Sequence, residues 1–428
     1  MSPVPRPIGA SDTSASYSDL DPKSTRLSSW QSGWILFASV AAVYVLLFSA
    51  PFLWKNVLWL QAMPAKAYPF VDMRGHLAAS EAYVNGNLMP GAPVPGDPLG
   101  RTHNGPVSML WLGYLGLRVE HTLIFAPICL LLFLGSVAYT LRLQSLREIF
   151  AGWLALTTPA SLLLVERGNI DLLVFAVLAV AFGLLAQSGR WPRWLGWGLI
   201  SGFIGFKYYP ALAYAALLEL GGTPSVRRAM LGVGAVVVVI YVTANYAELR
   251  AVAAAMPGNF LYPQFGASEL FRVAGFSPGM ATTLGASAWL GGASLLAWGL
   301  GPFTAIEAAP AAARLPFAGG GAILAFAFVA TVSPDYRVVF FLFCLPWLRM
   351  LGRASQPMIR RVAGSAFFLY LLVPWLSMLL GRLAVESRSL DYWWMVMLGK
   401  QAGWWALMLC VGALLIRQTA GGVRRLWA

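Results

Sequence analysis

The chain has 428 residues, of which 58% are hydrophobic and only 11% are charged. A water-soluble chain normally carries about a quarter charged residues, so this composition excludes an ordinary soluble globular protein. Lys and Arg exceed Asp and Glu by 30 to 17, but they lie mainly in short connections between apolar runs, which is typical of topogenic charge rather than of nucleic-acid binding.

Residues 1–28 are rich in Ser, Pro and Asp and show no apolar periodicity, which predicts a disordered cytoplasmic tail. The remaining residues, 29–428, are expected to form one all-α membrane domain, because apolar runs of roughly 17–25 residues recur along them. The expected membrane-crossing runs are 32–54, 121–141, 148–165, 170–188, 194–221, 228–246, 281–300, 315–332, 338–352, 362–381 and 392–416.

The basic connections set the expected orientation, because Lys and Arg are enriched on the cytoplasmic side. They hold Arg142, Arg147, Arg190, Arg193, Arg227, Arg228, Arg349, Arg353, Arg360, Arg361, Arg417, Arg424 and Arg425. All of them fall on one side only if 194–221 crosses twice, as two short helices that meet at Lys207–Pro210. Pro210 favours such a break. Two crossings give about twelve spans; the alternative, a single crossing, places the Arg349–Arg361 cluster outside.

On this topology the informative polar residues share the outer face. They lie in a long first extracytoplasmic loop, 55–120, in the turns Glu166–Asp171 and Ser333–Arg337, and at the Lys207–Pro210 break. The loop is expected to hold an amphipathic helix after Asp72 and an interfacial helix over 106–118. Several acidic residues, among them Glu148 and Glu219, flank spans and are not counted as site candidates.

Lys207 lies in the middle of a long apolar stretch, where a charge costs roughly 2.5–3.5 kcal/mol on insertion scales. It is therefore a candidate cation for an anionic ligand, with a snorkelling interfacial lysine as the alternative. Tyr208 and Tyr209 suit either interpretation. Arg337 is a candidate phosphate ligand because its guanidinium can bind two oxygens at once, although it could instead pair with Asp335.

The turn Glu166–Asp171 allows two interpretations. It could be an ordinary hairpin with a Glu166–Arg167 pair, or a ligand site at the start of the next helix, where Asn169 is well placed as the N-cap. Asp72 could likewise be an N-cap only. His76 and His103 lack the short spacing of a metal site, and no HExxH motif, Walker loop or GxSxG elbow occurs.

Taken in order, these motifs resemble those of a known family. They are Asp72 after the first span, Gly86-Asn87-Leu88, Asn104-Gly105-Pro106-Val107, the turn Arg167–Leu173, Gly205-Phe206-Lys207-Tyr208-Tyr209-Pro210 and Ser333–Arg337. The chain resembles the GT-C-type glycosyltransferases over roughly 30–350, most closely the bacterial polyprenol-phosphate-mannose-dependent mannosyltransferases. Two departures are that Gly105-Pro106 replaces a double proline and that Asp171 stands where many members have Asn.

The resemblance implies an inverting membrane glycosyltransferase of the bacterial plasma membrane. It would move a sugar, mannose by analogy, from a polyprenyl-phosphate donor to a lipid or glycan acceptor at the extracytoplasmic face. Asp72 would be the general base, and Lys207 and Arg337, with Arg167, would bind the donor phosphate. The expected sugar- or acceptor-binding residues are Asn169, Asp171, His103, Tyr208, Tyr209 and Asp335. No metal or other cofactor is required.

The alternative is a transporter or flippase of a lipid-linked or anionic solute. A transporter is expected to show an inverted repeat and charges on broken helices near the midplane. The Lys207–Pro210 break meets the second expectation, but no second copy of it stands in the other half of the chain. Polar turns gathered at one face favour the enzyme.

Overall fold

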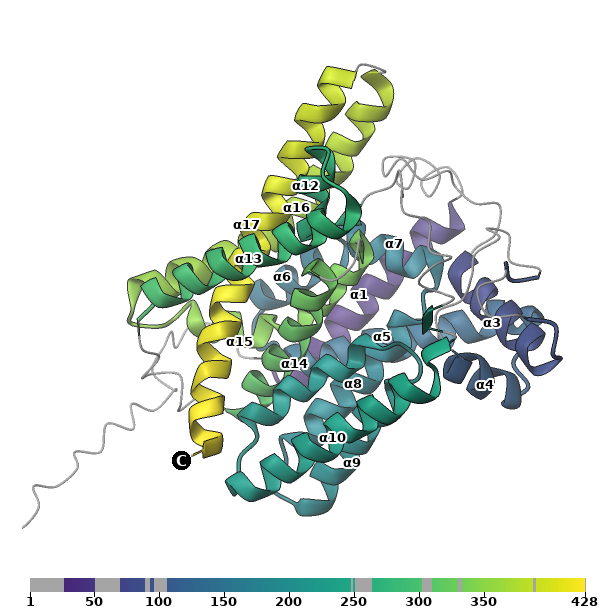
Figure 1. Cartoon of the computed structure of the whole chain (residues 1–428), viewed down its shortest axis with the longest axis horizontal. Helices are drawn as coiled ribbons and strands as arrows, with labels where there is room; N and C mark the ends of the chain where they lie inside the picture. Colours follow the sequence, from purple (N-terminus) through teal and green to yellow (C-terminus); the bar gives the residue numbers. More distant parts are fainter. Residues whose placement is uncertain are drawn as a thin grey trace, which may run out of the picture.

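The computed structural model describes residues 27–50, 70–88, 93–95, 106–247, 249–250, 264–301, 310–329, 333–387 and 390–427. Within these ranges the chain is a bundle of helices, so the predicted all-α class is confirmed (Figure 1). The exception is a minimal sheet of two residues per strand, in which β1 (Gln264–Phe265) pairs antiparallel with β2 (Ser333–Pro334). Residues 1–26 of the predicted tail and His103 lie outside the described residues, whereas Ser28, the last residue of the predicted tail, caps α1.

The helices follow the predicted order along the chain. The first half holds α1 (Ser29–Ser49), α3 (Val71–Val84), α4 (Pro106–Tyr114), η1 (Val119–His121), α5 (Thr122–Leu141), α6 (Leu146–Leu156), α7 (Pro159–Arg167), α8 (Asp171–Leu185), α9 (Arg190–Phe203) and η2 (Tyr209–Glu219). The second half holds α10 (Pro224–Ala244), α12 (Ala267–Val273), α13 (Pro278–Gly299), α14 (Ala311–Val329), η3 (Asp335–Phe343), α15 (Leu345–Leu351), α16 (Pro357–Ser387) and α17 (Leu390–Trp427).

Six of the described helices are long and apolar enough to cross a membrane, which makes the chain a multi-pass membrane protein. They are the helices that include Ser29–Leu47, Val119–Leu141, Pro224–Ala244, Ala311–Val329, Pro357–Leu380 and Met397–Trp427. The total of about twelve crossings stays a prediction, because the other candidates are short or broken.

Two expected spans are not continuous helices. The run 148–165 divides into α6 and α7, which bend by 59° at Thr157–Thr158. The sequence carries the signal for this break, since Thr158 caps α7 through its hydroxyl and Pro159 follows at the first helical position. The run 338–352 similarly divides into the 3₁₀ helix η3 and the short helix α15.

The run 194–221 folds into the expected pair of short helices, α9 and η2, with a break over 204–208. The two lie antiparallel, because Ser201 and Tyr214 share a 2.6 Å hydrogen bond while Arg193, near the start of α9, lies beside Gly222, just beyond the end of η2. Lys207 is therefore at the tip of this hairpin, and Glu219 is at its base.

Basic connections far apart in sequence lie close together in the structure. Glu148, at the start of α6, forms ion pairs with Arg349 and Arg353 at 3.0 and 3.7 Å. The base of the α9–η2 hairpin likewise meets the C-terminal part of α17, where Arg227 donates to the carbonyl oxygen of Arg425. Each contact brings together two connections that the sequence assigns to the same side, and the orientation of the whole bundle stays a prediction.

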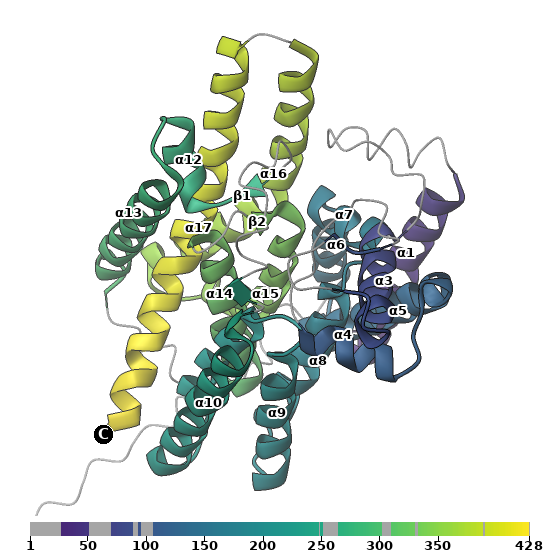
Figure 2. The ribbon, with the colours of Figure 1, turned by 45° about the vertical axis from the view of Figure 1, so that its right-hand side comes forward.

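The helices α16 and α17 extend past the rest of the bundle, at the end opposite the C-terminus (Figure 2). With 31 and 38 residues they measure about 46 and 57 Å, against roughly 30 Å for the hydrocarbon core of a bilayer. The predicted spans 362–381 and 392–416 therefore cover only part of each helix, and the apolar spans within these helices are Pro357–Leu380 and Met397–Trp427.

In the centre of the bundle, Phe175 of α8 stacks on Phe343 at 4.0 Å within one continuous buried core.

Candidate active site

The first helix after α1 in the described chain places Asp72 against the turn between α7 and α8. Phe70 precedes this helix, α3, in the left-handed conformation, with φ at 57°, and its amide donates to the carbonyl oxygen of Glu166 at 3.0 Å. Asp72 follows in the first turn and is 2% exposed. The helix has no side-chain cap, so the alternative of Asp72 as an N-cap is wrong.

The expected amphipathic character of α3 is also wrong. Ten of its 14 residues are buried, including polar ones such as His76 and Ser80. Most of the helix surface is covered by protein, so its sequence did not need an exposed polar stripe.

The turn between α7 and α8 depends on Gly168. Its φ is 56°, and a Cβ at this position would lie 2.8 Å from the Cβ of Phe70, so a side chain is excluded by both conformation and space. This close approach brings the neighbours of Gly168 to Asp72. Nη1 of Arg167 lies 3.5 Å from Oδ2 of Asp72, and Nδ2 of Asn169 donates to the same oxygen at 2.7 Å. Arg167 thus has Asp72 as an ion-pair partner.

Asn169 links the Asp72 carboxylate to the backbone at the start of α8. Its Nδ2 donates to Asp72, while its Oδ1 accepts from the backbone amide of Asp171 at 3.0 Å. A carboxylate accepts and an amide N–H donates, so these two partners set which way the Asn169 side chain points. Asn169 satisfies a free donor at the start of α8, as expected of a cap, although the helical boundary falls at Ile170.

Asp171 is fully buried and gathers polar groups from two other segments. Lys207 Nζ lies 3.3 Å from Oδ1, and the Tyr209 hydroxyl donates to the same oxygen at 2.5 Å. The Nε of Arg337, from η3, lies 4.0 Å from Oδ2, and its guanidinium sits 5.8 Å from the Tyr209 ring centre. Both cations therefore share one carboxylate.

Lys207 is 3% exposed and paired inside the protein, so the snorkelling alternative is wrong. The break between α9 and η2 places it there, because a continuous helix would have carried the chain away from α8. Its ammonium interacts electrostatically with Asp72 as well as with Asp171 and Arg337. The two carboxylates and their cations therefore form one buried polar network, which we call the α3–α8 network: Asp72, Arg167, Asn169, Asp171, Lys207, Tyr209 and Arg337.

The structure brings seven of the ten predicted site residues into this network. Tyr208 is half-buried beside it and meets Phe326 of α14 at 6.1 Å, edge to face. Asp335 begins η3, two residues before Arg337, but its side chain and all of His103 lie outside what the structure describes. Sequence reasoning missed the left-handed Phe70, because a bulky residue at positive φ leaves no signal in the sequence.

The network has the chemistry for binding an anion beside a base. Buried charges are costly unless paired, and here each carboxylate has a cation within 4.0 Å. An incoming phosphate could compete with Asp171 for Lys207 and Arg337, since the same donors suit both anions. In the described part of the chain, no group of three His, Cys, Asp or Glu side chains is placed to hold a metal ion.

Comparison with known proteins gives a weak structural likeness. No protein-family model matches the chain, and no curated protein matches it. The crystal structure of ArnT from Cupriavidus metallidurans in the apo state is similar over 90% of this chain and 78% of that chain, with 14% sequence identity and a TM-score of 0.36. Such a score describes a likeness in broad outline, so the roles of individual residues rest on the contacts of this chain.

Proposed function

We propose that the protein is an inverting membrane glycosyltransferase of the GT-C type, which takes a sugar from a polyprenyl-phosphate donor. The observation that carries this proposal is that Asp72, Lys207 and Arg337 belong to one buried network, in which Asn169 links the Asp72 carboxylate to the Asp171 backbone amide. A general base and a pair of phosphate-binding cations are the groups that a single displacement at an anomeric carbon requires.

In the proposed reaction, Asp72 takes the proton of the acceptor hydroxyl as its oxygen attacks the anomeric carbon. A well-placed general base contributes roughly 10²–10⁴-fold. The bond between that carbon and the phosphate oxygen breaks, and its electron pair leaves with the polyprenyl phosphate. Attack opposite the leaving group inverts the anomeric configuration. Arg167 and Asn169 hold the Asp72 carboxylate in place through Oδ2.

Lys207 and Arg337 offset the charge that develops on the leaving phosphate. Asp171 holds both cations before the donor arrives, and Tyr209 fixes Asp171 through its hydroxyl. Asp171 is thus a positioning residue in this scheme, in addition to its proposed place near the sugar with Asn169, Tyr208, Asp335 and His103. Mannose is the proposed sugar, and a lipid or glycan at the extracytoplasmic face is the proposed acceptor.

The test replaces Asp72 by Asn in the purified protein and measures transfer from polyprenyl-phosphate mannose to a lipid acceptor. We expect the rate to fall by roughly 10²-fold or more, because Asn cannot accept the proton but keeps the size of the side chain. Glu81→Gln, which removes a partly exposed carboxylate from the same helix, is the matched control and should retain the rate of the unmodified protein.

Lys207→Met supplies a second arm. If Lys207 binds the donor phosphate, its loss lowers transfer and also weakens binding of the bare polyprenyl phosphate, whereas Asp72→Asn leaves that binding in place. Transfer at the normal rate by Asp72→Asn would exclude Asp72 as the base. Loss of polyprenyl-phosphate binding in both variants would point to general disruption of the network.

A further inference from the structure

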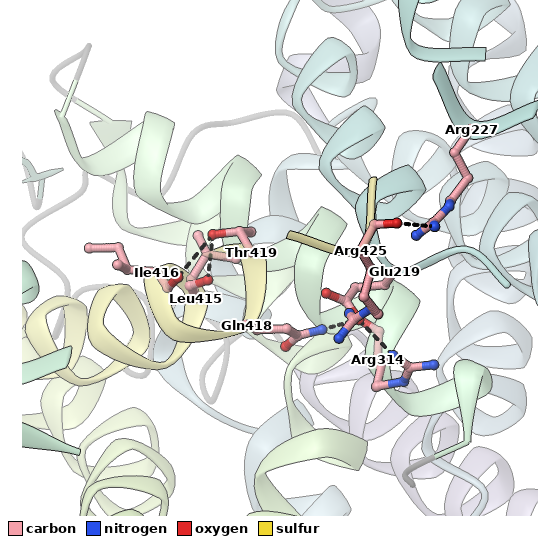
Figure 3. A network of polar contacts seen from close by, with 8 residues as sticks. All are labelled: Glu219, Arg227, Arg314, Leu415, Ile416, Gln418, Thr419 and Arg425. Atoms are coloured by element: carbon pink, nitrogen blue, oxygen red, sulfur yellow. Dashed lines mark hydrogen bonds and ion pairs between the residues drawn. The ribbon is translucent and has the colours of Figure 1, made fainter. Parts of the chain in front are cut away.

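A second polar cluster lies at the base of the α9–η2 hairpin, at the opposite end of η2 from Lys207. Since η2 has 11 residues and a 3₁₀ helix rises about 2.0 Å per residue, the two clusters are about 22 Å apart. Four helices meet here, and they contribute Glu219, Arg227, Arg314 and Arg425 (Figure 3). We call it the basal cluster.

One carboxylate serves two arginines in the basal cluster. Oε2 of Glu219 accepts from Arg314 at 2.7 Å and from Arg425 at 2.8 Å. Arg227 donates its Nη2 to the backbone carbonyl oxygen of Arg425 at 2.6 Å (Figure 3). Among the described residues it forms no ion pair within 4.0 Å, although Glu219 acts on it electrostatically from across the cluster. These four side chains carry three positive charges and one negative charge, so the cluster has positive charge in excess.

The basal cluster surrounds a cavity of about 240 Å³, lined by the four charged side chains and by the Leu220–Gly222 segment. A water molecule occupies about 30 Å³ of liquid, so the space holds far more than one water. Gly222 has φ at 111°, and the Arg193 guanidinium lies 3.0 Å from where its Cβ would be, which adds a further cation at the rim.

One buried hydrogen-bond donor beside the cavity has no acceptor. Arg227 is 5% exposed, yet its Nε has no hydrogen-bond partner among the described residues. A buried guanidinium with an unused donor is costly unless an anion completes it. Arg314 and Arg425 side chains are 15% and 34% exposed, so the arginines lead from the interior to the surface. The amino end of α10, at Pro224, follows the glycines and adds its positive dipole.

We propose that the basal cluster binds a phosphate group, supplied by the headgroup of an anionic phospholipid or by free phosphate. Guanidinium groups bind phosphate through paired hydrogen bonds, which suits Arg227 with its unused Nε. Basic pockets between membrane helices recognise anionic headgroups on the side where such lipids concentrate. The connections that hold Arg193 and Arg425 also lie at this end, which is the predicted cytoplasmic side.

Thermal unfolding of the purified protein in detergent tests the proposal. The melting temperature is measured while phosphatidylglycerol, phosphatidylcholine or inorganic phosphate is added over a concentration series. We expect phosphatidylglycerol to raise it saturably and phosphatidylcholine to do so much less. Stabilisation by inorganic phosphate at similar concentrations supports the site and assigns it to free phosphate, whereas a response to phosphatidylglycerol alone assigns it to the lipid.

Arg227→Gln is the decisive variant because Arg227 takes no part in the Glu219 pairs. We expect the apparent affinity for the stabilising phosphate to fall roughly tenfold, the effect of one lost charge-assisted hydrogen bond. Arg228→Gln is the matched control: it removes the same charge from the next residue, which is exposed and lies over Trp427 instead. Its affinity should be unchanged.

Arg227→Lys keeps the positive charge but loses the planar guanidinium that can donate two hydrogen bonds at once. It should bind phosphate with intermediate affinity, and it serves as a second variant if Arg227→Gln does not fold. Three results would overturn the proposal. One is that none of the three additives stabilises the protein, another is that Arg227→Gln and Arg228→Gln weaken the response equally, and the last is that phosphatidylcholine acts as strongly as phosphatidylglycerol.

Discussion

Replacing Asp171 by Asn removes the carboxylate that Lys207 and Arg337 share while leaving the shape of the side chain almost unchanged. At the 3.3 Å separation of Lys207 and Asp171, Coulomb's law with an effective dielectric constant of about 20 gives an attraction of about 5 kcal/mol. Breaking a buried pair by removing one partner costs roughly 3–5 kcal/mol, since the other charge stays buried. We expect the lower end, about 3 kcal/mol, because Asp72 still attracts Lys207.

A double-mutant cycle isolates the pair. The free energy of unfolding is measured by denaturant titration in detergent micelles for Asp171→Asn, Lys207→Met and the double variant. If the two groups act together, the double variant loses about 2 kcal/mol less than the sum of the single losses. Lys207→Met combined with Glu219→Gln is the control, because these residues lie about 22 Å apart at opposite ends of η2 and their effects should add.

The reasoning fails if Asp171→Asn unfolds at the same free energy as the unmodified protein, or if the Asp171–Lys207 cycle is additive to within about 0.5 kcal/mol. Either result would mean that Lys207 finds an equivalent partner without Asp171. The proposed role of Asp171 as the group that positions both cations would then be withdrawn, while the assignment of Asp72 as base would stand on its own test.

Two further predictions address the turn at Gly168 and the orientation of the bundle. Gly168→Ala should destabilise the protein by about 1–3 kcal/mol in thermal unfolding, and Gly86→Ala should destabilise it less. Both glycines have positive φ, but only at Gly168 would the new Cβ contact another residue, Phe70. Equal losses of stability would contradict that contact. In a chain whose native cysteines are replaced by Ala, a membrane-impermeant thiol probe on intact cells should label Asn85→Cys and should label Ser188→Cys only after lysis. The reverse pattern would contradict the predicted orientation.

The helix breaks show where sequence patterns were sufficient and where they were not. The break at Lys207–Pro210 was predictable because a lysine and a proline interrupt one apolar stretch. The break at Thr158–Pro159 also has a local signal, which is a capping residue before a proline. It was not predicted, because the residues on both sides are apolar and read as one continuous span. The sequence gives no local indication that α3 would be covered on most sides.

The charged residues divide in the same way. Their locations in turns were evident from the sequence, but their partners were not, because Asn169 and Asp72 are 97 positions apart and meet only through the contact of Phe70 with the Gly168 turn. Glu219 is the clearest miss. It looked like a residue that merely flanks a span, yet it is 2% exposed and pairs with two arginines, one of them 206 positions away.

The sequence by itself determined that this is a multi-pass helical membrane protein with its polar turns between apolar runs, because hydrophobic burial and backbone hydrogen bonding in a bilayer leave few alternatives. Only the tertiary structure decided which charge pairs with which. Lys207 pairs with Asp171, and Arg167 with Asp72, because helix packing brings distant turns within 4 Å and a buried charge must take the partner that lies there.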